Sequence, residues 1–156
     1  RLNALSRLLE EAGFATRISA NITGIIWDKF IHNCAINPIC ALTGLLANQV
    51  SAVAAADALQ DRLLEELLAI VRARGIRLVE ADPIASIKEI CRTVAVKPSM
   101  LQHMESGRQT EIDSQNGAVV REGQALGIPT PWNHAITLLV KARSACPCPD
   151  RVKKSD

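Results

Sequence analysis

The stretch Lys29-Phe30-Ile31-His32-Asn33-Cys34-Ala35-Ile36-Asn37 predicts the central element of this protein. Lys29, Asn33 and Asn37 recur every fourth residue, so a helix projects all three from one face over roughly 12 Å of its axis. The other sides of that helix are apolar and suited to a core, because they carry Phe30, Ile31, Cys34, Ala35 and Ile36. We therefore expect a largely buried helix that bears a line of one cation and two amides.

Two explanations fit this polar line. A buried ammonium or amide without partners is costly, so the line either faces other polar groups or borders a wet pocket that holds a polar ligand. The alternative is an ordinary solvated stripe. Pro38 follows directly and disfavours helical geometry at Asn37, so a kink there would either aim Asn37 at a ligand or let it cap its own broken backbone.

The composition favours a single domain of packed helices. A chain of 156 residues has the length of one domain, so it needs no metal or disulfide scaffold. Hydrophobic residues make up 48% and aromatic residues only 3%, so the core must be built from Leu, Ile, Val and Ala. Such residues, apart from the β-branched ones, are good helix formers.

Charge and cysteine usage narrow the class of protein further. The net charge of +2 comes from interleaved acids and bases, with a basic cluster only at residues 151–154, so we expect no nucleic acid partner. Five cysteines without a CxxC pair or a zinc spacing indicate reduced thiols in the cytoplasm. The sequence has no long unbroken apolar run and no signal peptide, so we expect a cytoplasmic protein without a membrane partner.

Hydrophobic periodicity and glycine stops predict the helices in order. The chain opens inside a helix that ends at Gly13, which suggests that upstream residues are missing, and an extended connector follows at 14–19. No stretch alternates as a strand, so we predict an all-α fold of antiparallel helices, with a disordered tail at 144–156. The remaining predicted helices cover 22–46, 51–74, 83–96, a short segment from 99, the region from 110 to 126, and 132–143.

Four helix starts carry a recognisable cap. Asn21 is expected to cap the central helix, and Asp82-Pro83 opens another with proline in its first turn. Ser99 with Gln102, and Thr110 with Asp113, each fit the spacing of a capping box.

No motif for a dinucleotide or a metal occurs in the sequence. The glycines never form GxGxxG after a strand, and neither a Walker A loop nor HExxH is present. His32, His103 and His134 are far apart and lack an obvious nucleophile, so we interpret them as ordinary surface or part-buried histidines.

Three motifs follow one another along the chain. They are Trp27-Asp28-Lys29-x3-Asn33-x3-Asn37-Pro38; Pro98-Ser99-Met100-Leu101-Gln102; and Thr110-Glu111-Ile112-Asp113-x2-Asn116-Gly117, followed by Gly127-Ile128-Pro129-Thr130-Pro131-x-Asn133. In this order and spacing they resemble the C-terminal helical domain of the ketopantoate reductase (2-dehydropantoate 2-reductase) family, over roughly residues 2–143. The resemblance implies an all-α bundle of the 6-phosphogluconate dehydrogenase C-terminal type, serving as a substrate-binding and dimerisation domain at 1–143. In the family an N-terminal Rossmann domain, absent from this chain, binds NADPH.

The resemblance also implies a role for individual residues. Lys29 corresponds to the catalytic general acid and Glu111 to its acidic partner in the pocket. The substrate-binding residues implied are Asn33, Asn37, Asn48 and Ser99. From the residues alone, Ser99 and Glu111 fit helix N-terminus roles better.

Two positions depart from the family pattern. Gln49 stands where a glycine usually follows Asn48, and His103 stands where some members carry an aspartate. Because His103 puts a bulkier ring in place of a short carboxylate, the resemblance does not identify which 2-oxo acid is the substrate.

The chemistry of the residues agrees with these roles. Hydride delivery to a ketone leaves an alkoxide, and a positioned lysine can protonate it, a step worth ~100-fold to ~10,000-fold in rate. Amides and a hydroxyl can hold the carboxylate of a 2-oxo acid without adding a competing acid, and Glu111 near Lys29 would favour the charged ammonium.

We therefore expect this chain to be the C-terminal half of an NADPH-dependent 2-oxo acid reductase, which the resemblance places in pantothenate biosynthesis. We also expect it to form a homodimer and to be inactive as an isolated fragment. The alternative is a non-catalytic helical dimerisation or interaction module that retains only the fold.

Overall fold

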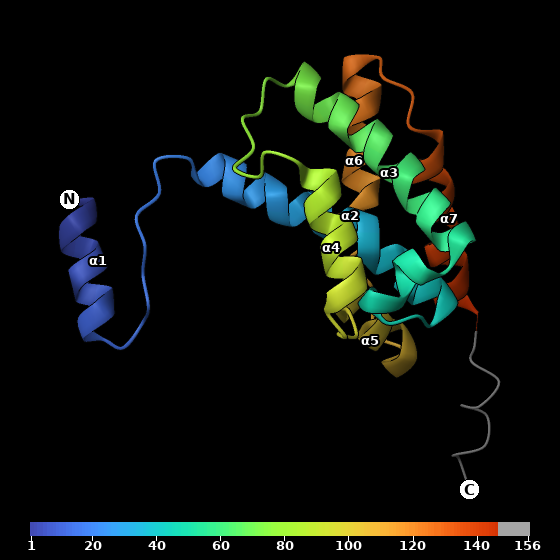
Figure 1. The fold of residues 1–156 in the computed structure, drawn as a ribbon, viewed down its shortest axis with the longest axis horizontal. Coiled ribbons are helices and arrows are strands. Elements are labelled where there is room, and N and C mark those ends of the chain that lie inside the picture. Colours follow the sequence, from blue (N-terminus) through green and yellow to red (C-terminus); the bar gives the residue numbers. More distant parts are fainter. Residues whose placement is uncertain (147–156) are drawn as a thin grey trace, which may run out of the picture.

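The computed structural model describes residues 1–146, and over that range the chain is all helical, with no strand. This confirms the predicted fold class. Figure 1 shows α2 in the middle of the body, where it contacts η1, α3, α4, α5 and α7. The helices are α1 (Leu2–Glu11), α2 (Ile22–Thr43), the 3-10 helix η1 (Ala47–Ala52), α3 (Ala54–Ala73), α4 (Pro83–Thr93), α5 (Ser99–Ser106), α6 (Asn116–Leu126) and α7 (Pro131–Ala145).

Helix α2 begins at its predicted cap and ends at a glycine. The Asn21 side chain accepts a hydrogen bond from the Gly24 amide at 3.0 Å, so the predicted cap is confirmed. Gly44 ends the helix in the left-handed conformation (φ 77°), which glycine adopts without steric cost. Between these points, Ile31 and every residue from Cys34 to Ala41 are buried, as expected for a core helix.

Pro38 does not end α2, because another helix satisfies the carbonyl that it leaves free. Proline lacks the amide that would bond the Cys34 carbonyl one turn back. The fully buried Asn116 donates from Nδ2 to that carbonyl at 3.0 Å and also to Asn133 Oδ1 at 3.0 Å. Asn133 Nδ2 in turn donates to Glu66 Oε2 at 2.7 Å. Asn116 and Asn133, here called the asparagine pair, thus tie α2, α3, α6 and α7 together.

Both predicted capping boxes are wrong. Pro98 occupies the cap position of α5, so Ser99 already lies in the first turn, and Gln102 Nε2 donates instead to the Lys97 carbonyl at 2.8 Å. Thr110 and Asp113 cap nothing, because residues 111–115 close a separate turn and α6 begins only at Asn116. The predicted Asp82 cap is confirmed, since its side chain accepts from the Ala85 amide at 2.9 Å.

Several predicted helix ends also differ from the structure. Instead of one helix over 51–74, η1 covers Ala47–Ala52 and α3 starts at Ala54. The central helix stops three residues before the predicted end, and α4 stops at Thr93 rather than Val96. Helix α7 includes Ser144 and Ala145, which were assigned to the tail, and the rest of the predicted disorder falls largely on 147–156, outside the described residues.

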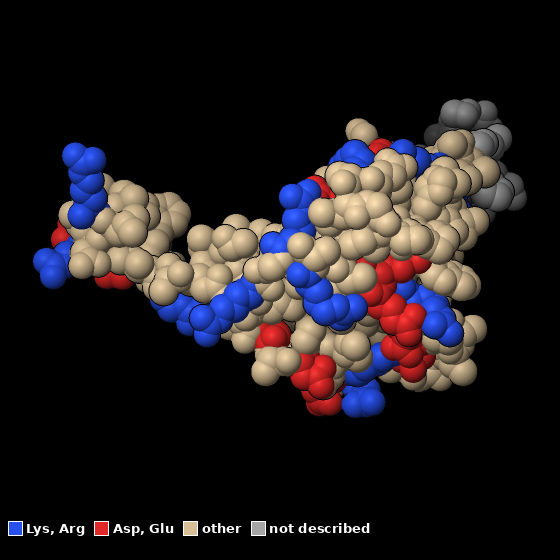
Figure 2. Space-filling model, turned by 90° about the horizontal axis from the view of Figure 1, so that it is seen from above, with Lys and Arg blue, Asp and Glu red and all other residues tan. Residues whose placement is uncertain are grey.

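Helix α1 and the connector at 14–19 stand apart from the body as an arm (Figure 1). The helix buries no residue, and Leu2, Leu5 and Leu8 are more than half exposed. Figure 2 shows the arm as a separate lobe with much uncharged surface in this view. No helix within residues 1–146 is long and apolar enough to cross a bilayer.

Candidate functional site

A cavity of about 230 Å³ lies where α2 meets η1, the end of α4 and the start of α5. It brings together three of the predicted site residues, Asn33 and Asn37 from α2 and Ser99 from the start of α5. The full lining consists of polar His32, Asn33, Asn37 and Ser99 and apolar Ile36, Ala47, Ile90, Val96 and Pro98.

Asn37 is fixed by a contact outside the cavity. Its side chain is only 5% exposed, and Nδ2 donates to Gln115 Oε1 at 3.3 Å. The side-chain oxygen Oδ1 of Asn37 remains available to a further partner, since the side-chain nitrogen Nδ2 already has one. Asn37 therefore does not cap its own backbone at Pro38, which was one of the two possibilities left open by the sequence.

A long-range backbone hydrogen bond and an ion pair hold the side of the cavity away from α2 in place. The Ala47 amide donates to the Val96 carbonyl at 3.0 Å, so η1 is pinned to the segment between α4 and α5. Lys97 Nζ pairs with Glu105 Oε2 at 2.8 Å and braces the start of α5. These contacts place Ser99, exposed in the first turn of α5, beside the amides of α2.

Lys29 lies on the same face of α2 as Asn33, one turn before it and about 6 Å away along the axis. It is exposed and does not line the cavity, and within residues 1–146 it forms no ion pair. Its neighbour Asp28 is buried and accepts from the amides of Val79 (3.0 Å) and Glu80 (3.2 Å) at Oδ2. Asp28 thus anchors the loop after α3 along the first half of α2, next to Lys29.

Glu111 pairs with His103 rather than with Lys29. His103 Nδ1 lies 3.1 Å from Glu111 Oε1, and both side chains are partly buried. The other carboxylate oxygen of Glu111 is buried and has no protein partner. Glu111 also opens the turn that ends at Gln115, whose amide donates to the Glu111 carbonyl at 3.1 Å. Glu111 therefore reaches the cavity only indirectly, through the Gln115 side chain that holds Asn37.

Asn48 lies in η1 directly after Ala47, which lines the cavity, but Asn48 itself does not. Its side-chain oxygen is buried without a protein partner. The structure thus places Asn48 beside the cavity with an unused acceptor.

His32 is a lining residue that sequence reasoning missed. Its Nε2 is buried without a protein partner, and burial lowers the pKa of the imidazole, while Glu80 and Asp28 act in the opposite direction. Burial thus favours the neutral form of the ring. The available signal was that His32 and Ile36 form a second column on α2, adjacent to the column of Asn33 and Asn37.

The described part of the chain offers no metal site, because no three of its His, Cys, Asp and Glu side chains gather closely enough to hold an ion. Its four described cysteines are free, and burial raises the pKa of Cys40 to about 12, which makes that thiol unreactive. A larger cavity of about 670 Å³, lined by residues such as Thr43, Met104 and Arg108, contains none of the predicted site residues.

Proteins with similar sequence or structure include ketopantoate reductases and a D-mandelate dehydrogenase. A 2-dehydropantoate 2-reductase from Aquifex aeolicus is 32% identical over 147 residues, which cover 91% of this chain and 47% of that protein. The crystal structure of a PanE/ApbA family ketopantoate reductase from Ralstonia eutropha JMP134 matches with a TM-score of 0.85 and 34% identity, over 91% of this chain and 48% of that chain. A ternary structure of D-mandelate dehydrogenase with NADH and anilino(oxo)acetate matches with a TM-score of 0.81 and 26% identity, over 92% and 48%.

The chain spans about half the length of the relatives it matches. The family model described as ketopantoate reductase PanE/ApbA C terminal matches residues 21–144, which include α2 through nearly all of α7. The helical bundle is accordingly of the 6-phosphogluconate dehydrogenase C-terminal type, as the resemblance implied. With most of its length matched by that model, the chain belongs to the ketopantoate reductase PanE/ApbA family and carries its C-terminal domain.

Proposed function

We propose that this chain is the substrate-binding and catalytic half of an NADPH-dependent reductase that converts a 2-oxo acid to a 2-hydroxy acid, as in pantothenate biosynthesis. The observation that carries the proposal is the cavity in which Asn33, Asn37 and Ser99 meet, with Lys29 one turn away on the same helix face. Family membership alone gives only the coarser class, a ketopantoate reductase-like domain, because this fold also serves D-mandelate dehydrogenase.

In this proposal each residue has a distinct task. The amides of Asn33 and Asn37 and the hydroxyl of Ser99 hold the carboxylate and the oxo group of the substrate. Lys29, one helical turn before Asn33, donates the proton that neutralises the alkoxide as charge develops on the oxo oxygen. Its exposed side chain forms no ion pair within residues 1–146, so it is available to a bound substrate.

Glu111 and Asn48 complete the proposed site from its edge. Glu111 places a carboxylate at the turn that carries Gln115, and its Oε1 lies 3.1 Å from His103 Nδ1. The unused buried oxygens of Glu111 and Asn48 are acceptors that a bound ligand or water can satisfy.

The cofactor is assigned to another domain. NADPH supplies the hydride when bound, but no glycine-rich phosphate loop occurs in these 156 residues. We propose that the half of the relatives that this chain does not cover corresponds to a Rossmann domain that binds NADPH, and that residues 1–143 bind the substrate and dimerise.

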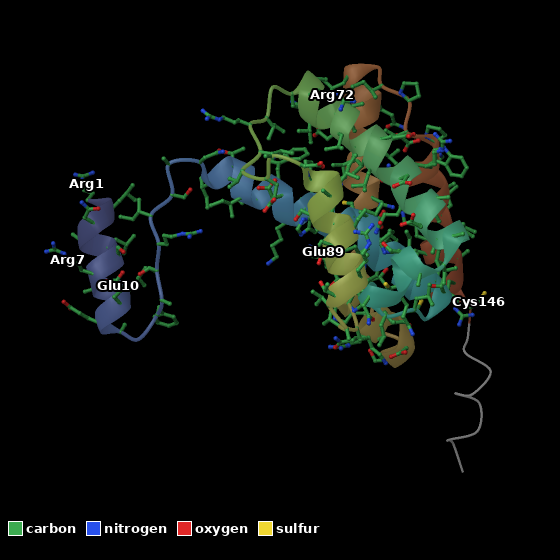
Figure 3. The ribbon with its side chains drawn as sticks, viewed as in Figure 1. Arg1, Arg7, Glu10, Arg72, Glu89 and Cys146 are labelled. Atoms are coloured by element: carbon green, nitrogen blue, oxygen red, sulfur yellow. The ribbon has the colours of Figure 1, made fainter. Side chains whose placement is uncertain are left out.

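The arm supports the proposal that the cofactor and the substrate are bound by different domains. The family's C-terminal model starts only at residue 21, whereas similarity to the relatives covers about nine-tenths of the chain. On α1, Leu2, Leu5 and Leu8 are exposed, while Arg7 points away from the rest of the molecule (Figure 3). An amphipathic helix with an uncovered apolar face calls for a partner surface. We propose that this surface belongs to the cofactor domain.

Substitutions on α2 test the proposed reaction in a protein that contains both halves. We expect Lys29→Ala to lower kcat by ~100-fold or more, since the proton donor is lost. Asn33→Ala and Asn37→Ala should mainly weaken substrate binding, by about 1 to 3 kcal/mol each. Arg72→Ala is the matched control, because Arg72 is an exposed cation on α3 (Figure 3) with no ion pair within the described residues.

Steady-state rates with a panel of 2-oxo acids decide the outcome. Near wild-type turnover in Lys29→Ala would end the catalytic assignment and favour the non-catalytic helical module. The chain alone should show no reductase activity, and micromolar NADPH binding to it by calorimetry would contradict the proposed division between the two halves.

A further inference from the structure

Gln115 is a buried polar residue that contacts the lining of the cavity from outside it. It lies directly before α6, is only 8% exposed, and does not line the cavity itself. Its Oε1 accepts a hydrogen bond at 3.3 Å from Nδ2 of Asn37, which does line the cavity. The other polar lining residues, His32, Asn33 and Ser99, form no side-chain hydrogen bond within residues 1–146. Asn37 is therefore the polar group of the cavity that the protein holds from behind.

The main chain around Gln115 is itself held on both sides. Its amide donates to the Glu111 carbonyl at 3.1 Å, and its carbonyl accepts a hydrogen bond at 2.9 Å from the first turn of α6. The next residue, Asn116, donates from Nδ2 to the Cys34 carbonyl at 3.0 Å, about one turn before Asn37 on α2. The buried Gln115 side chain thus starts from a point that is fixed relative to α2.

The hydrogen bond to Gln115 decides what the Asn37 amide offers to a ligand. A half-turn of an asparagine amide about its last side-chain bond exchanges an oxygen that accepts for a nitrogen that donates. The bond to Gln115 occupies one hydrogen of Nδ2, so Oδ1 and the second hydrogen of Nδ2 remain available. Without that bond the amide can adopt either orientation, and selecting one when a ligand binds then costs affinity.

We infer that Gln115 is a positioning residue for the proposed reaction, holding the Asn37 amide in the orientation that binds the 2-oxo acid. This inference rests on the proposed function, because it takes Asn37 as a substrate-binding residue and Lys29 as the proton donor. Gln115 itself lies outside the cavity, so its loss weakens substrate binding and leaves proton transfer from Lys29 unchanged.

Gln115→Met tests the inference in a protein that contains both halves. Methionine has a similar length but no amide, so we expect KM for the best 2-oxo acid to rise by about 3-fold to 10-fold while kcat stays within about 2-fold of the wild type. Gln60→Met is the matched control. Gln60 is a fully buried amide on α3 that donates to the Ala35 carbonyl of α2 at 3.4 Å but does not line the cavity, so its loss should lower stability without changing KM.

A double-mutant cycle shows whether Gln115 acts through Asn37. In the Asn37→Ala background, Gln115→Met should raise KM by less than about 2-fold further, because the amide that Gln115 positions is gone. Gln115→Asn retains a polar side chain that is one methylene shorter and loses the contact, so it should raise KM as Gln115→Met does and replaces that variant if methionine prevents folding.

The same measurements separate the inference from the proposed function. If KM is unchanged when Gln115 is replaced, or rises equally with and without the Asn37 side chain, the inference is overturned and the proposed function stays intact. A wild-type protein that reduces no 2-oxo acid would refute the proposed function, and the role of Gln115 with it.

Discussion

Removing the Asn116 side chain should destabilise the fold more than any surface change, because of what Asn116 does for Pro38. The Asn116 Nδ2 group is the hydrogen-bond donor to the Cys34 carbonyl, which proline leaves without its helical partner. The same group donates to Asn133 Oδ1, and Asn116 is fully buried. In Asn116→Ala both acceptors remain buried, and no described side chain replaces the lost donor.

The magnitude follows from these two acceptors. Each buried group left without its partner costs about 1 to 3 kcal/mol, so we expect a total loss of roughly 2 to 6 kcal/mol in the free energy of unfolding. For a chain of this size that corresponds to a fall in Tm of about 2 to 4 °C per kcal/mol. The control Gln124→Ala, at an exposed position of the same helix, should change stability by less than about 0.5 kcal/mol.

A double-mutant cycle with Pro38→Ala tests the stated cause. Alanine at position 38 restores the backbone amide that bonds the Cys34 carbonyl, so Asn116→Ala should then cost about 1 to 3 kcal/mol less than in the wild-type background. The four proteins are compared by urea unfolding, followed by circular dichroism at the helix band. Additive effects of the two substitutions, within about 0.5 kcal/mol, would refute the claim that Asn116 compensates for Pro38.

Two further predictions concern pH and assembly. Burial lowers the pKa of His32 below its ordinary value of 6.5, so the unfolded chain binds the proton first and stability should decline as the pH falls through 6.5. In His32→Gln, the free energy of unfolding, measured by urea titration one pH unit above and one below 6.5, should fall by less than in the wild type. An equal fall in both proteins would contradict the prediction. We also expect a homodimer, and the exposed Trp132, Leu138 and Leu139 make α7 its predicted contact. Leu139→Glu should then give a monomeric mass by light scattering, unlike Gln124→Glu on α6, and a wild-type chain that is monomeric at high micromolar concentration would refute the dimer.

Local signals in the sequence were sufficient for most helix ends. The glycines predicted to stop helices, such as Gly13 and Gly127, adopt the left-handed conformation, and the caps at Asn21 and Asp82 form as expected. The sequence predicts a break between the helices over 22–46 and 51–74, but not its bounds or the 3-10 helix within it, because the Ala-rich segment after Ser51 favours helix intrinsically. Long-range bonding decides there, since the Ala47 amide reaches Val96 and forms η1 where propensity alone predicts a longer α-helix.

The polar residues of the site were predictable to different degrees. Asn33 and Asn37 followed from helical periodicity, and the structure brings them to one cavity. Ser99 followed only from the family resemblance, because its contact with α2 depends on how the segment before α5 folds back. His32 was missed because a cavity against a helix is lined by two adjacent columns of residues, and only the column with the charged residue stood out. The Gln115 contact that fixes Asn37 joins residues 78 positions apart, a separation that no local pattern encodes.

Helix α2 combines two tasks that would conflict in an isolated helix. The binding face needs Asn37 in a fixed orientation, yet the proline that follows disfavours helical geometry at that very residue. Contacts from α6 and the turn before it resolve the conflict, because Gln115 holds the Asn37 side chain while the next residue, Asn116, takes the carbonyl that Pro38 leaves free. Two consecutive residues thus fix the side chain of the proposed binding residue and the backbone beneath it. The stability of the bundle and the geometry of the cavity therefore depend on the same short segment, so substitutions there should change both together.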